Sequence, residues 1–183
     1  MLDSPAQHTS FAVLAAFALL CGCAHLPGPT ASAPDHGVST ATARDQPCIS
    51  TAQGCIALNP DVSADNISRT ICVPGYTRTV RPSTSYTQGV KLKLMREAGL
   101  DTATISAYEL DHIVPLALGG HPRKLSNLAL QPWDGEHGAH RKDILESRLH
   151  REVCRHELTL QAAQHCIAQD WEACAARDPG RRH

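Results

Sequence analysis

The chain has few aromatic residues and almost no net charge, and each shortage limits what it can be. Only 4% of its 183 residues are aromatic although 42% are hydrophobic, so aliphatic side chains must form most of any core. The formal net charge is −1, whereas a dedicated nucleic-acid-binding protein is usually strongly basic. The length fits one domain of ordinary size together with a leader.

Basic residues nevertheless gather in one stretch that contains no acid. The stretch lies between Asp65 and Glu97, and its bases are Arg69, Arg78, Arg81, Lys91, Lys93 and Arg96. Such a stretch fits a solvated surface and a phosphate-contacting patch equally well. Both interpretations remain open from the sequence.

The N-terminal segment resembles an export signal that lacks its usual positive start. Residues 1–10 contain no Lys or Arg, and the apolar run at 11–20 is too short to span a bilayer. Leu20-Cys-Gly-Cys23 follows and is similar to a bacterial lipobox. We therefore predict a signal peptide and lipobox over residues 1–23, with Cys23 acylated. A buried hydrophobic helix is the alternative.

Residues 24–47 are rich in Ala, Pro, Ser, Thr and Gly and have few large apolar side chains. A segment of this composition cannot bury enough surface to offset its chain entropy. The sequence therefore predicts a flexible linker over 24–47 and a folded domain over 48–176.

Six cysteines follow the leader, and no C-x-x-C pair occurs among them, which argues against a zinc ribbon. An even number of cysteines in an exported chain indicates disulfides. A single helix over 158–175 would hold Cys166 and Cys174 about 12 Å apart, beyond the Cα spacing of about 7 Å that a disulfide allows. Both are therefore expected to pair with Cys48 and Cys55, unless the helix breaks first.

Residues 107–143 contain the most informative motif. Asp111 and His112 are adjacent, Asn127 follows, and His140 stands 13 residues further on. Neighbouring residues on a strand point to opposite faces, so the carboxylate could bind a metal ion while the imidazole stays free as a base. This division of roles is typical of metal-assisted hydrolysis.

This motif resembles the HNH endonucleases, whose hallmark is a ββα-metal finger, with the finger core at about 108–150. The resemblance extends to small exported bacterial HNH-type proteins, through three segments: 70–82, 108–120 and 142–154. It implies an α+β fold in which a hairpin over about 109–131 and the following helix form the finger. A C-terminal helix follows, and a disulfide-tied segment precedes it. It also implies that Cys72 pairs with Cys154.

The resemblance further implies a nuclease that hydrolyses phosphodiester bonds in DNA with little sequence specificity. Asp111 and His140 would bind one divalent ion, Mg²⁺, Mn²⁺ or Zn²⁺. His112 would activate water, because its near-neutral pKa suits a base. Asn127 would orient His112.

The chain departs from the family pattern at the end of the finger, where either Glu136 or His137 could be the third ligand. The alternative function is a non-catalytic envelope lipoprotein that uses the finger as a metal- or disulfide-stabilised binding module. The expected partners are nucleic acid and, through Cys23, the envelope membrane, and no protein partner is indicated. The expected location is periplasmic or envelope-anchored, or otherwise secreted.

Overall fold

The computed structural model describes residues 46–177. The predicted signal peptide, the lipobox with Cys23 and most of the predicted linker lie outside the described residues. Within them, no helix is both long and apolar enough to cross a membrane.

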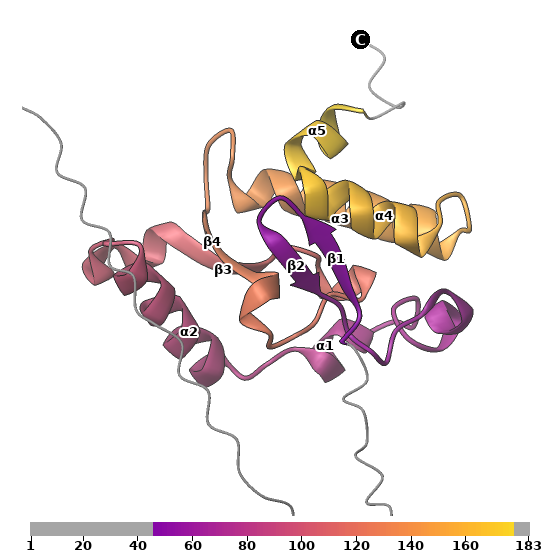
Figure 1. Cartoon of the computed structure of the whole chain (residues 1–183), viewed down its shortest axis with the longest axis horizontal. Coiled ribbons are helices and arrows are strands. Elements are labelled where there is room, and N and C mark those ends of the chain that lie inside the picture. Colours follow the sequence, from indigo (N-terminus) through magenta and orange to yellow (C-terminus); the bar gives the residue numbers. More distant parts are fainter. Residues whose placement is uncertain (1–45, 178–183) are drawn as a thin grey trace, which may run out of the picture. The chain divides into compact units, whose positions relative to one another are not determined.

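Two small antiparallel hairpins supply all the strands of residues 46–177. They are β1 (Cys48–Thr51) with β2 (Gly54–Ala57), and β3 (Tyr108–His112) with β4 (Leu128–Pro132). In the second hairpin Asp111 lies opposite Ala129 and His112 opposite Leu128. The hairpin predicted at about 109–131 is therefore confirmed, and the chain is a mixed α+β protein (Figure 1).

Helices connect and follow the hairpins. The α-helices are α1 (Tyr76–Val80), α2 (Thr84–Glu97), α3 (Ala139–Cys154), α4 (Leu160–Gln169) and α5 (Trp171–Ala176). The 3-10 turns are η1 (Ala64–Arg69), η2 (Thr102–Ala107), η3 (Leu116–Leu118) and η4 (Leu125–Asn127). The helix α3 follows β4, which places strand, strand and helix in the order expected of the finger.

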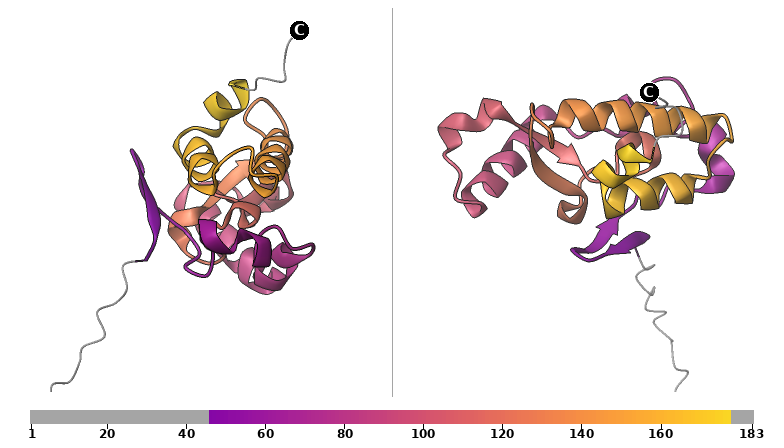
Figure 2. Two further views of the ribbon diagram at one scale, coloured as in Figure 1. Left: turned by 90° about the vertical axis from the view of Figure 1, so that its right-hand side faces the viewer. Right: turned by 90° about the horizontal axis from the view of Figure 1, so that it is seen from above.

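The core is aliphatic, as the composition predicts. Leu145, Leu149 and Val153 of α3 are buried against Ala163 and Ile167 of α4. The two helices lie side by side (Figure 2). No aromatic residue between positions 46 and 177 belongs to the buried hydrophobic set.

The prediction of a single C-terminal helix over 158–175 is wrong, because the helix is interrupted at Asp170. This residue is extended (φ −167°, ψ 99°), and its carboxylate accepts the backbone N–H of Ala173 at 2.9 Å. The backbone N–H groups in the first turn of a helix have no partner within the helix, and the Asp170 carboxylate accepts one of them. Two short helices, α4 and α5, result.

The break also corrects the predicted pairing of four cysteines. It brings the Cα atoms of Cys166 and Cys174 to 5.4 Å, and these two residues form a disulfide with each other. Cys48 and Cys55 pair across the first hairpin at a Cα distance of 5.6 Å. The distance argument against the Cys166–Cys174 pair failed because it assumed one continuous helix.

Candidate functional site

Asp111 and His112 line different cavities, as adjacent residues of a strand should. His112 lines a cavity of about 230 Å³ together with Arg81, Lys91 and Trp133. Asp111 lines a larger cavity of about 380 Å³ together with Lys142. His112, the predicted base, and Asp111, the predicted metal ligand, therefore line two separate cavities.

His112 is nearly buried, with 7% of its surface exposed. Its Nε2 lies 3.1 Å from the carbonyl oxygen of Pro122. Because a carbonyl only accepts, Nε2 carries the hydrogen, and Nδ1 then holds the lone pair of a neutral ring. Burial lowers the pKa of His112 despite the opposing effects of the Pro122 carbonyl and Asp111. The ring is thus suited to accept a proton at neutral pH.

Asn127 holds the loop that follows His112 and does not reach the imidazole. Its fully buried amide donates to the carbonyl oxygens of Val114 and His121, both at 3.0 Å, and accepts from the backbone N–H of Val114 at 2.8 Å. The loop contains Pro122, the partner of the His112 ring. Any orientation of His112 by Asn127 is therefore indirect.

Gly120 shows how tightly this loop is closed. A Cβ atom at this position would lie 1.7 Å from the carbonyl oxygen of Val114 and 2.7 Å from Nδ2 of Asn127. Only glycine allows the backbone to approach so closely. The Gly-Gly pair in the sequence is the signal of this constraint.

Asp111 belongs to a buried ionic cluster that sequence reasoning missed. The Nζ of Lys142 lies 2.8 Å from Oδ2 of Asp111, 2.5 Å from Oε1 of Glu146 and 2.8 Å from the carbonyl oxygen of His112. Only 3% of the Lys142 side chain is exposed. The four-residue spacing of Lys142 and Glu146 was a signal for their pairing, but not for its burial.

The acid–base properties of this cluster follow from its burial. Burial alone would lower the pKa of Lys142, but the carboxylates of Glu146 and Asp111 outweigh it and raise that pKa above its ordinary value. Burial raises the pKa of Glu146 to about 7, and the Lys142 ammonium offsets this only in part. Lys142 is therefore charged at neutral pH, where Glu146 titrates.

The predicted metal ligands have other partners in this arrangement. Oδ1 of Asp111 accepts the backbone N–H of His112 at 2.7 Å, while Oδ2 binds Lys142. The His140 side chain is 63% exposed, and its Nε2 lies 3.8 Å from Oδ1 of Asp134. Of the possible third ligands, Glu136 is exposed, whereas His137 Nδ1 lies 2.5 Å from Oε1 of Glu172.

These donors do not fit a divalent ion as they stand. Among residues 46–177, three ligand atoms from His, Cys, Asp or Glu meet within 4.8 Å only at Cys72, His150 and Cys154. A cation on Asp111 would also lie beside the Lys142 ammonium, which would repel it. Asp111 and His140 as a ligand pair stay a prediction.

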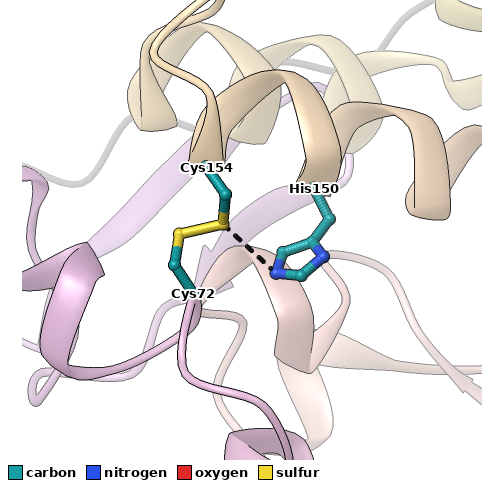
Figure 3. Close-up of side chains that lie close together, drawn as sticks. All are labelled: Cys72, His150 and Cys154. Atoms are coloured by element: carbon teal, nitrogen blue, oxygen red, sulfur yellow. Dashed lines mark hydrogen bonds between the residues drawn. A yellow bond between two sulfur atoms is a disulfide. The ribbon is translucent and has the colours of Figure 1, made fainter.

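Cys72 and Cys154 form the disulfide that the resemblance implies, with a Cα distance of 5.6 Å (Figure 3). His150 lies next to it, with Nε2 at 2.9 Å from the carbonyl oxygen of Ile71 and at 3.4 Å from Sγ of Cys154. Cysteine binds metals as a thiolate, and both sulfurs are bonded to each other here. The group is therefore a covalent clamp between α3 and the loop before α1.

Replacing Lys142 with Met tests the importance of the ionic cluster. The substitution leaves two carboxylates without their buried cation, and we expect the free energy of unfolding to fall by about 3–5 kcal/mol. Urea denaturation would measure the loss. The matched control is Lys93→Met, since the Lys93–Glu97 pair has side chains that are 47% and 55% exposed and should change stability by less than about 1 kcal/mol. Equal losses in both variants would contradict the expectation.

Comparisons with known protein families, with curated proteins and with solved structures find no match for this chain.

Proposed function

We propose that the protein cleaves phosphodiester bonds in nucleic acid, in the cavity that contains His112. One observation carries the proposal: a nearly buried imidazole shares a cavity with two cationic side chains, Arg81 and Lys91. A base and cations in one concavity are the groups that attack on a phosphodiester requires.

His112 has the role of general base in this proposal. Its Nδ1 takes a proton from a water molecule as the water oxygen bonds to phosphorus and the bond to the leaving oxygen breaks. Arg81 and Lys91 offset the negative charge that develops on the phosphoryl oxygens, and the guanidinium of Arg81 suits two-point contact with a phosphate. The loop held by Asn127 keeps Pro122 against the ring, so that the proton stays on Nε2.

Glu109 is the acidic side chain of this cavity. Burial, followed by the nearby Asp111 and Asp143, raises the pKa of Glu109 to about 7. Its repulsion of a bound phosphate is therefore weaker near neutral pH than that of an ordinary glutamate.

The resemblance implies a divalent ion at Asp111 and His140. This mechanism does not include it, because the Lys142 ammonium pairs with the Asp111 carboxylate. Arg81 and Lys91 supply the positive charge instead. Cleavage rates measured with EDTA and with added Mg²⁺, Mn²⁺ or Zn²⁺ distinguish the two mechanisms. A rate that survives EDTA supports the mechanism without the ion.

A plasmid-nicking assay on Arg81→Ala and Lys91→Ala tests the proposal. We expect the wild type to nick the plasmid and each variant to do so about tenfold or more slowly at low substrate concentration, since each loses a charged phosphate contact. Each variant should also weaken the salt dependence, by about 0.9 in the slope of log K against log salt per lost contact on duplex DNA. The control is Lys93→Ala, an exposed base on the same helix that does not line the cavity. No cleavage by the wild type of the plasmid or of single-stranded DNA, with EDTA or with any added metal, would refute the proposal.

A non-catalytic binding module is the second candidate, and the capture of Asp111 by Lys142 favours it. For this function His112 would be a structural residue of the hairpin. Its replacement would then change stability but not any turnover of nucleic acid.

We further propose that the protein is exported and anchored through Cys23. Its three disulfides are consistent with an extracellular or periplasmic location, because such bonds persist in oxidising compartments. Labelling with a fatty-acid analogue should mark the wild type and Cys21→Ser but not Cys23→Ser, since the lipobox cysteine is the one acylated. An unlabelled wild type would favour simple secretion.

A further inference from the structure

The cavity of His112 also has an aromatic wall. Trp133 directly follows β4, lines this cavity and is partly exposed. Its ring lies 5.3 Å from the His140 ring, with 31° between the planes. Its backbone N–H donates to the carbonyl of Ala107 at 3.1 Å, and its carbonyl accepts the N–H of His140 at 3.3 Å. The backbone of Trp133 is therefore held at the cavity by two hydrogen bonds.

Cationic and aromatic groups thus meet in one small space. Arg81 and Lys91 share the cavity of about 230 Å³ with Trp133. A phosphate bound by the cations would have a neighbouring nucleobase within reach of the indole. This volume lies just below the roughly 300–1,000 Å³ of ligand cavities, so the space suits a small group such as one unpaired base.

We propose that this cavity takes single-stranded nucleic acid, with an unpaired base stacked on Trp133 and the adjoining phosphate on Arg81 and Lys91. This inference rests on the proposed function and specifies its substrate class. In a duplex, each base face is covered by its neighbours, and a base reaches a side chain only after it leaves the stack at an energetic cost. A single strand presents its base faces without that cost.

Base stacking has to supply this preference. Phosphate contacts serve single and double strands alike, and Glu109 adds no attraction for phosphate. Stacking on an aromatic side chain strengthens binding by roughly 5- to 150-fold per base, and it depends little on sequence because every base has a π-face. Recognition of a single strand without a sequence preference therefore follows from these side chains.

Binding measured without cleavage tests the inference. The probe is a fluorescently labelled single-stranded oligonucleotide of mixed sequence. Its binding is compared by anisotropy with that of its duplex, on a His112→Ala background that slows turnover. We expect the single strand to bind about tenfold or more tightly than the duplex. Adding Trp133→Ala should weaken single-strand binding about tenfold or more and change duplex binding less than twofold, while Trp133→Phe should retain most of the affinity.

The second tryptophan provides the matched control. The chain contains two Trp residues, and Trp171 packs against the core and does not line the cavity of His112. Trp171→Phe should bind as the parent does, and the fluorescence of its remaining tryptophan should be quenched by the single strand. Circular dichroism melting shows whether each variant is folded.

The possible results separate this inference from the proposed function. Equal affinity for the single strand and the duplex, or unchanged binding in a folded Trp133→Ala variant, would overturn the inference and leave phosphodiester cleavage standing. Tight single-strand binding that depends on Trp133, in a wild type that cleaves nothing, would support the inference and refute the enzyme. Absence of binding to either probe would overturn the inference, and the cleavage assay on the wild type would still decide the proposed function.

Discussion

Replacing His112 with Ala is expected to lower the rate of phosphodiester cleavage by about 10²- to 10⁴-fold, the usual contribution of a general base. The substitution removes the lone pair of Nδ1 but leaves Arg81 and Lys91 in place. The maximal rate should therefore fall much more than the affinity for the substrate. Initial rates of plasmid nicking at several substrate concentrations measure both quantities.

The pH dependence provides a second readout of His112. A base acts in its deprotonated form, and burial lowers the pKa of this histidine from its ordinary value of 6.5. The wild-type rate should therefore rise with pH and level off below the pH expected of a free histidine. His165→Ala is the control, because His165 is exposed on α4. Wild-type activity in a folded His112→Ala variant would refute the assignment of the base.

Removal of the Cys72–Cys154 disulfide is expected to destabilise the protein more than removal of the Cys48–Cys55 or the Cys166–Cys174 disulfide. The bond joins residues 82 positions apart. In the chain-entropy model, a loop of this length contributes about 4.5 kcal/mol to stability, because the unfolded chain loses more freedom when a longer loop is closed. The double variant Cys72→Ser, Cys154→Ser should show this loss in urea denaturation under non-reducing conditions.

The short disulfide of the first hairpin is the matched control. Cys48 and Cys55 are only 7 positions apart, and the same model gives about 2.5 kcal/mol for their bond. Their replacement should therefore destabilise the protein less. Equal losses in the two double variants would contradict the entropic argument. Peptide mapping that finds Cys72 and Cys154 as free thiols would show that the clamp is absent.

Local features of the chain were predictable from its sequence. The hairpin carrying Asp111 and His112 was expected at about 109–131 from the resemblance that the motif at residues 107–143 carries. The helix α3 was expected on the same grounds, since the finger places a helix after its hairpin. These elements depend on residues close in sequence, whose turn and helix preferences act without the rest of the fold.

The break at Asp170 could not be predicted from the spacing of apolar residues. The apolar spacing continues from Ala163 through Ile167 to Cys174, as one uninterrupted helix would require. The Cys166–Cys174 bond and the cap at Asp170 together favour two helices, and neither is visible in the spacing alone.

By itself, the sequence determined the aliphatic core, the β3–β4 hairpin with its Asp-His pair, and the following helix. Only the tertiary structure decided what these residues contact. Lys142 reaches Asp111 across 31 positions, and Arg81, Lys91 and Trp133 reach the cavity of His112 from separate segments. Contacts between such distant residues depend on how whole elements pack, because burial and direction are properties of the folded chain and not of the spacing along it.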